Sequence, residues 1–228
     1  MKTYRAQAGP FRERPYYTQE DVERICTDEL RASGLLPAEP GAIRIERFIE
    51  KRFGFSPTYA DLGEGILGAT KFGPRGAEAM LISIRLEQEG TRGAERRLNS
   101  TLAHEAGHAL LHAHLFALED PASLFEGQVS GPKVMCRDEV LADGYRGRWW
   151  EFQANMAIGA LLLPKALLEL AVAPFLKPSG KLRFPRLDSG RREEVVAHLA
   201  ATFDVNPVVA RIRLDQLFPH AIADQLTL

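Results

Sequence analysis

Residues 96–112 read RRLNSTLAHEAGHALLH and contain two histidines four positions apart, His104 and His108. No proline interrupts residues 95–118, and their apolar positions recur at helical spacing, which predicts a long, mostly buried helix. Residues four apart lie one turn apart on the same helix face, so both imidazoles can reach one metal ion. Glu105, beside the first histidine, can reach water at such a metal without ligating it, and is therefore the candidate general base.

A catalytic zinc site needs a third protein ligand and an open position. Glu151 is the main candidate, because it begins an apolar helix predicted over residues 149–163, where a carboxylate is costly unless it is paired or metal-bound. Asn155, one turn further on, would then hydrogen-bond a ligand histidine. The alternative is that Glu151 only benefits from water and the helix dipole at the helix N-terminus.

His112 and His114 are competing third ligands. A straight helix carries His112 away from a metal shared by His104 and His108. His114 has the spacing of the metzincins, but those proteins need a glycine three residues after the second histidine, and Leu111 stands there.

Composition narrows the class of protein. The chain has 228 residues, 45% hydrophobic and 26% charged, as expected for a globular protein with its own core. A net charge of -1 argues against a general polycation for nucleic acid. Two cysteines, Cys26 and Cys136, exclude a disulfide scaffold. The N-terminus has no apolar signal segment, and the longest apolar stretch, residues 152–164, is shorter than the roughly 20 residues of a membrane span. We therefore expect a cytoplasmic protein with no membrane segment.

The pattern along the chain predicts three parts. We expect an N-terminal arm and helix over residues 1–40, a catalytic domain over 41–170 and a C-terminal helical segment over 171–228 that packs on it. Within them the expected elements are a loose arm (1–15), helices (about 18–33, 42–53, 95–118, 149–163, 191–203 and 207–218), strands (near 58–62, 66–71 and 79–86), a long irregular loop (119–148) and a basic loop (174–188). A loop as long as 119–148 inside a compact domain is usually functional.

Two stretches together resemble the ImmA/IrrE metallopeptidases: RRLNSTLAHEAGHALLH, residues 96–112, and EFQANMAIGALLLP, residues 151–164. The second is similar to the family's E-x-E-A-N-x-F-A-A-x-L-L-M-P signature. The strand AMLISIRL and the closing segment VAHLAATFDVNPVVARIRLDQL fit the family's order of parts, so the resemblance covers about residues 40–218.

The resemblance implies an α+β, zincin-like fold in which a small, mostly antiparallel sheet packs on the HExxH helix, followed by a helix-turn-helix-like segment. It implies metal ligation by His104, His108 and Glu151, with Glu105 as the catalyst. It also implies a bacterial or phage endopeptidase that cleaves a helix-turn-helix repressor and so derepresses a stress-response or mobile-element operon.

The sequence departs from the family in several places. Gln153 stands where the family has a second glutamate, and Ala157-Ile158-Gly159 and Leu163 also differ, which we interpret as packing changes. The 42 residues from 109 to 150 exceed the expected separation between the two motifs, so residues 119–148 are interpreted as an insertion.

Three further roles are assigned from the sequence. Tyr145 is the chosen donor to the tetrahedral oxyanion, with Arg146, Arg148 and His112 as alternatives. The Cys136 thiolate is considered as a latent-state ligand, against a plain buried thiol. Strand 79–86 is interpreted as an edge strand on which a substrate peptide adds.

The sequence favours a metal-dependent endopeptidase with Zn²⁺, or Mn²⁺ as the alternative ion. One rival is a DNA-binding transcriptional regulator with a metal-sensing site, and the other is a non-catalytic repressor-binding module. Direct DNA binding is not expected, because acidic neighbours nearly cancel the charge of Arg211 and Arg213 on the last helix.

Overall fold

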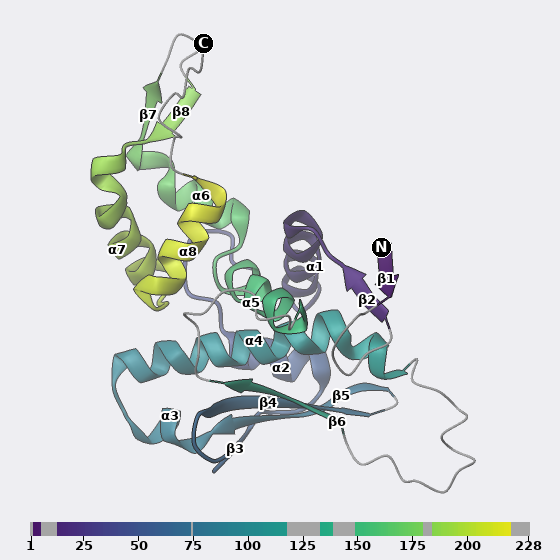
Figure 1. Ribbon diagram of the computed structural model, residues 1–228. Coiled ribbons are helices and arrows are strands. Elements are labelled where there is room, and N and C mark those ends of the chain that lie inside the picture. Colours follow the sequence, from purple (N-terminus) through teal and green to yellow (C-terminus); the bar gives the residue numbers. More distant parts are fainter. Residues whose placement is uncertain are drawn as a thin grey trace, which may run out of the picture.

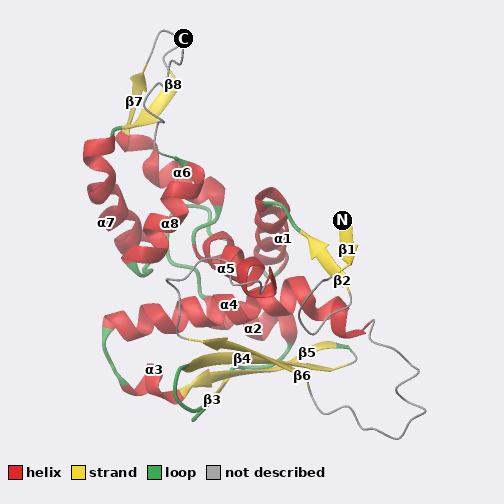
Figure 2. Ribbon diagram, in the orientation of Figure 1, coloured by secondary structure: helices red, strands yellow, loops and turns green. Residues whose placement is uncertain are grey.

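The computed structural model describes residues 2–5, 13–73, 75–117, 133–138, 149–179 and 184–219. These residues form an α+β protein in which one long helix separates a small sheet from a group of shorter helices (Figure 1). The strands of the main sheet lie together on one side of that helix, and two short hairpins lie at the periphery (Figure 2).

The main sheet has four strands in the order β3-β5-β4-β6. Its members are β3 (Thr58–Ala60), β4 (Ile66–Gly73), β5 (Gly76–Ser83) and β6 (Lys133–Asp138). The pair β3–β5 is parallel, whereas β4 pairs antiparallel with both β5 and β6. Gly76 begins β5 with a φ of 116°, a value that suits glycine at this tight connection.

Two expectations about this sheet are wrong. Strand 79–86 was expected at an edge, but β5 lies between β3 and β4, and helix α3 (Ile84–Gln88) replaces its last residues. Residues 119–148 were expected to be irregular throughout, but residues 133–138 form β6, which pairs with β4. The other residues of that segment lie outside the described part of the chain.

The long helix α4 (Arg92–Ala117) crosses the sheet and carries the HEAGH motif. The Thr91 hydroxyl accepts a hydrogen bond from the Ala94 backbone N–H at 3.1 Å and so caps its first turn. Helix α4 packs against β4 and β5 on one side and against α5 (Trp149–Leu162) on the other. Because both sides are covered, most of its residues are buried from Ser100 to Leu111.

Helix α5 is apolar almost all round and lies at the centre of the helical layer. It contacts α4, α1 (Gln19–Ala32) and the C-terminal helix α8 (Pro207–Leu217). Among the described residues no single helix is long and apolar enough to cross a membrane. Two bent helix pairs, Trp149–Leu162 with Lys165–Phe175 and Arg192–Thr202 with Pro207–Leu217, reach that length and apolar composition only together.

Two predicted helices begin and end where their capping residues indicate. The Thr18 side chain and the Asp21 side chain of α1 form a reciprocal capping box. Helix α2 (Ile45–Phe53) ends at Gly54, whose φ is 79°, and packs on α4.

The N-terminal residues are more ordered than expected. A loose arm was predicted over 1–15, but β1 (Lys2–Arg5) pairs antiparallel with β2 (Glu13–Tyr16). Pro15 of β2 is buried, and its carbonyl oxygen accepts a hydrogen bond from Gln153 of α5 at 2.8 Å.

The C-terminal segment adds helices and a hairpin. Its elements are α6 (Lys165–Val172), the 3-10 helix η2 (Ala173–Phe175), β7 (Leu176–Ser179), β8 (Phe184–Leu187), the 3-10 helix η3 (Ser189–Arg191), α7 (Arg192–Thr202) and α8. Helix α6 was not predicted, and the antiparallel pair β7–β8 replaces part of the expected loop over 174–188. The two closing helices lie within a residue of their predicted bounds.

Both arginines of α8 are paired with acidic side chains of the protein itself. Arg213 is 1% exposed, donates to the Leu163 carbonyl oxygen at 3.1 Å and forms an ion pair with Glu23 of α1. Arg211 is more exposed, and it is paired with Glu193 of α7. These contacts attach α8 to α1, α5 and α7, as expected of a structural cap.

Candidate metal centre

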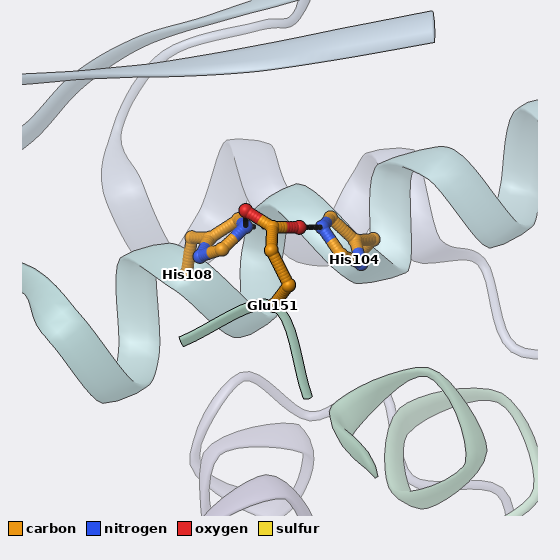
Figure 3. Close-up of side chains that lie close together, drawn as sticks. All are labelled: His104, His108 and Glu151. Atoms are coloured by element: carbon orange, nitrogen blue, oxygen red, sulfur yellow. Dashed lines mark hydrogen bonds and ion pairs between the residues drawn. The ribbon is translucent and has the colours of Figure 1, made fainter. Parts of the chain in front are cut away.

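Two helices bring three ligand-type side chains to one point. His104 and His108 project from α4 on the same face, with exposures of 1% and 0%, and Glu151 reaches them from the first turn of α5 (Figure 3). The His104 and His108 Nε2 atoms are 3.0 Å apart. The Glu151 Oε2 and Oε1 atoms lie 3.0 Å from His104 Nε2 and 3.5 Å from His108 Nε2, respectively.

This group could hold a metal ion. One ligand atom from each residue lies within 4.8 Å of the other two. Within the described residues, this is the one group of three or more histidine, cysteine or carboxylate side chains that lie so close together. Two imidazole nitrogens and one carboxylate are a donor set that divalent metals accept. Two Nε2 atoms at 3.0 Å beside a carboxylate also need positive charge between them, because imidazole lone pairs and carboxylate oxygens otherwise repel.

The carboxylate of the group is held in its ionised form. Burial raises the pKa of Glu151, but hydrogen bonds and charge interactions with His104 and His108 lower it more, and the result lies well below the ordinary value. The anion is therefore available to a cation over the whole neutral range of pH.

Asn155 supports His104 from behind. Its Oδ1 atom lies 3.0 Å from His104 Nδ1, on the side of the ring away from Glu151. An amide oxygen only accepts, so His104 Nδ1 carries the proton and Nε2 is left to face the metal position. This is the role that the sequence predicted for Asn155.

His108 is supported by a longer series of side chains. Its Nδ1 atom is 3.0 Å from His112 Nδ1, and His112 Nε2 is 2.9 Å from Gln153 Oε1. Gln153 Nε2 then donates to the Pro15 carbonyl oxygen at 2.8 Å. Both His112 and Gln153 are buried.

Glu105 faces the sheet side of the same helix. It is fully buried, and the Thr70 hydroxyl of β4 donates to its Oε2 atom at 2.6 Å. Gly68 of β4 lies against it, since a Cβ there would be 2.7 Å from Glu105 Oε1. The strand therefore defines the space that this carboxylate occupies.

The structure separates the competing ligand candidates. Helix α4 continues unbroken to Ala117, so neither His112 nor His114 joins the group of His104, His108 and Glu151. His112 is a buried partner of His108.

Other predicted residues lie outside the described part of the chain. They are the proposed oxyanion donor Tyr145 and its alternatives Arg146 and Arg148. Cys136 belongs to β6, but its side chain is outside the described part, so the latent-thiolate idea stays a prediction.

Sequence reasoning missed Gln153 and Thr70. Gln153 was interpreted as a packing change, but its amide is hydrogen-bonded to His112, and His112 in turn contacts the candidate ligand His108. The signal was present, because a buried polar residue in an apolar helix requires a partner, the argument already applied to Glu151. Thr70 gave no such signal, since threonine is ordinary in a strand.

No protein-family model matches the chain, and no curated protein matches it. The resemblance to the ImmA/IrrE peptidases rests on the two sequence motifs alone.

Proposed function

We propose that the chain is a metal-dependent endopeptidase with a zincin-like fold, of the ImmA/IrrE type. The observation that carries the proposal is the convergence of His104 and His108 with Glu151 from a second helix, in a motif that also contains the buried Glu105. A solvated glutamate at a helix N-terminus would not need to approach two buried histidines to within 3.5 Å.

Each residue of the site has a role in this proposal. His104, His108 and Glu151 would hold Zn²⁺, with Mn²⁺ as the alternative, since a mixed nitrogen and oxygen site accepts both. The metal would supply Lewis acidity toward a peptide carbonyl and toward water. Glu105 takes a proton from the attacking water and delivers it to the leaving amine. Tyr145 is proposed from the sequence as the donor to the oxyanion.

The substrate class comes from the resemblance. We propose a helix-turn-helix repressor as the protein substrate, with derepression of a stress-response or mobile-element operon as the consequence. Such a substrate places the reaction in the cytoplasm.

Two other functions make different predictions. A DNA-binding regulator is disfavoured, because Arg213 is buried and Arg211 is paired with Glu193. A non-catalytic module that only sequesters a repressor would keep its effect after loss of Glu105, whereas a peptidase would not.

The first experiment measures metal content by mass spectrometry in the wild type, His104→Ala and Glu151→Ala. The proposal expects about one zinc or manganese ion per chain in the wild type and its loss in both variants. Metal retained by Glu151→Ala would refute the assignment of the third ligand. A wild type that takes up neither ion when supplied with it would refute the metal site.

The second experiment compares cleavage of candidate repressors by the wild type and by Glu105→Gln. The variant should bind metal normally and lose cleavage, by about 100-fold or more, because general-base catalysis contributes about that much. Glu95→Gln, an exposed change in the first turn of the same helix, is the matched control and should cleave normally. Full cleavage by Glu105→Gln would refute the proposed base.

A further inference from the structure

We infer that Gln153 and His112 form a positioning relay, which turns the Nε2 atom of His108 toward the metal position and connects the metal centre to strand β2. The inference rests on the proposed metal site, and it assigns to Gln153 and His112 a function that neither motif indicates. The relay is the series Pro15, Gln153, His112 and His108, joined by contacts of 2.8, 2.9 and 3.0 Å.

The direction of the relay begins at a backbone carbonyl. The Pro15 carbonyl oxygen can only accept, so the amide nitrogen of Gln153 must be the group that faces it. The amide oxygen of Gln153 then faces His112 Nε2, and because that oxygen can also only accept, Nε2 must carry a proton.

The next step concerns the tautomer of His112. Its ring is fully buried, and its hydrogen-bond partners are the Gln153 amide oxygen and the His108 ring, neither of which is an anion, so a second proton on the ring would be a buried charge without a paired anion and the ring is neutral. A neutral imidazole has one N–H. With that proton on Nε2, the Nδ1 atom of His112 is an acceptor and faces His108 Nδ1.

The last step reaches the ligand. His108 Nδ1 must donate to His112 Nδ1, which leaves His108 Nε2 as the ring nitrogen that would bind a metal. That atom faces His104 Nε2 and Glu151. The relay therefore holds a proton on His108 Nδ1, as Asn155 does on His104 Nδ1 through a single hydrogen bond.

Glutamine suits position 153 for a specific reason. Its amide has a donating end for Pro15 and an accepting end for His112, and a carboxylate would have only accepting ends. A glutamate at this position would leave the Pro15 carbonyl oxygen without its donor and would bury a second negative charge near Glu151. Glutamine at position 153 therefore matches the carbonyl oxygen of the buried Pro15.

The direct test is nitrogen-15 NMR of the histidine rings in the metal-free wild type. The relay predicts that His108 is protonated at Nδ1 and His112 at Nε2, with a nitrogen–nitrogen coupling across the His108–His112 hydrogen bond. A His108 ring without a proton on Nδ1, or absence of the coupling, would overturn it. This result depends neither on peptidase activity nor on the folding of a variant.

The second test measures Zn²⁺ affinity by competition with a chromophoric chelator. Gln153→Leu should bind zinc about 10–100-fold more weakly than the wild type, the usual effect of losing such a supporting contact. Gln153→Glu keeps an acceptor for His112 Nε2 but loses the donor to Pro15, so its affinity should fall by less. Ser100→Ala is the matched control, because it removes a hydrogen bond from a buried residue of α4 outside the relay. Its affinity should equal that of the wild type.

The outcomes separate the relay from the proposed function. Cleavage by the wild type together with unchanged zinc affinity in both Gln153 variants would refute the relay and leave the peptidase standing. The predicted tautomers in a wild type that takes up no zinc would support the hydrogen-bond directions and refute the peptidase.

Discussion

The carboxylate of Glu105 lies against a glycine, and this contact decides where the proposed base can be. A Cβ on Gly68 would lie 2.7 Å from Glu105 Oε1 and 2.8 Å from Thr101 Cγ2. Distances below 3.0 Å require a shift of one of the groups. The Thr70 hydroxyl holds the other carboxylate oxygen at 2.6 Å, so the carboxylate has little freedom to adjust.

We therefore expect Gly68→Ala to displace Glu105 without touching the metal ligands. Cleavage should fall by up to about 100-fold, since a misplacement of about 1 Å can cost that much, while zinc affinity stays at the wild-type value. The measurement is steady-state cleavage beside a zinc titration. Gly93→Ala is the control, because its nearest contact would be an ordinary 3.8 Å. Wild-type cleavage by Gly68→Ala would show that the base does not depend on this strand.

At the scale of elements, the distance between α4 and α5 determines whether the site forms at all. Gly107 makes the close approach possible, because a Cβ there would be 2.7 Å from Ala157 Cβ and 3.1 Å from the Ala154 carbonyl oxygen. The histidines belong to α4 and Glu151 to α5, so any separation of the helices also separates the ligands.

Gly107→Ala should destabilise the fold by about 1–3 kcal/mol, the usual cost of overpacking, and weaken zinc binding. Urea unfolding of the metal-free protein and a zinc titration measure the two effects. The double variant with Ala157→Gly should recover part of the loss, because it removes the shorter contact but not the one with the Ala154 backbone. Equal stability of the single variant and the wild type would contradict the close-packing argument.

Another connection between elements involves Asp204, in the turn between α7 and α8. Asp204 has a φ of 51° and accepts hydrogen bonds from Arg92 and Arg96 of α4. Burial raises its pKa, but the hydrogen bonds and charges of Arg96 and Arg92 together lower it more, so the folded value lies below the ordinary 3.8.

A lowered pKa stabilises the folded state at pH values above the unfolded pKa. The contribution of Asp204 should therefore be complete at neutral pH and disappear as the pH falls below 3.8 through the folded value. We expect Asp204→Asn to lower the free energy of unfolding by about 1 kcal/mol or less at pH 7, because the side chain is 36% exposed. Below the folded pKa of Asp204 the variant and the wild type should be equally stable. Urea unfolding over a pH series measures this. Asp28→Asn, which removes an exposed pair with Arg31, is the control, and a cost independent of pH would contradict the prediction.

At the scale of the whole molecule, one buried ion pair joins parts far apart in the sequence. Arg213 of α8 is paired with Glu23 of α1, and Glu23 also accepts from the Lys165 backbone N–H at the start of α6. Arg213 passes close to Gly159 of α5, where a Cβ would be 2.9 Å from its Cδ atom. The N-terminal helix, the central helix and the C-terminal segment thus meet at this side chain.

Arg213→Met should destabilise the protein by about 3–5 kcal/mol, because it leaves the Glu23 charge buried without its partner. Arg211→Met removes an exposed pair and should cost at most about 1 kcal/mol. The double variant Arg213→Met with Glu23→Leu should recover much of the loss. Denaturant unfolding of the four proteins measures this, and equal effects of the two single arginine variants would contradict the role of the buried pair.

The sequence by itself determined the features that depend on local spacing. The capping box of Thr18 and Asp21, the glycine after α2, and the uninterrupted apolar pattern of α4 each specify a helix through neighbours along the chain. The same holds for His104 and His108, whose common face follows from a separation of four residues. Glu151 was chosen because a carboxylate in an apolar helix needs a partner, and Asn155 because it lies one turn further on. In the structure Glu151 contacts both histidines and Asn155 contacts His104.

Only the tertiary structure decided which residues complete the site. β6 exists through pairing with the distant strand β4, and β1 and β2 exist through pairing with each other, so their own residues carried no clear signal. The internal place of β5 follows from strand order, which alternation of side chains does not specify. The contact of Thr70 with Glu105 spans 35 positions, and that of Gln153 with Pro15 spans 138. Hydrogen bonds of that kind form only when separate elements pack together, and no spacing along the chain reveals them in advance.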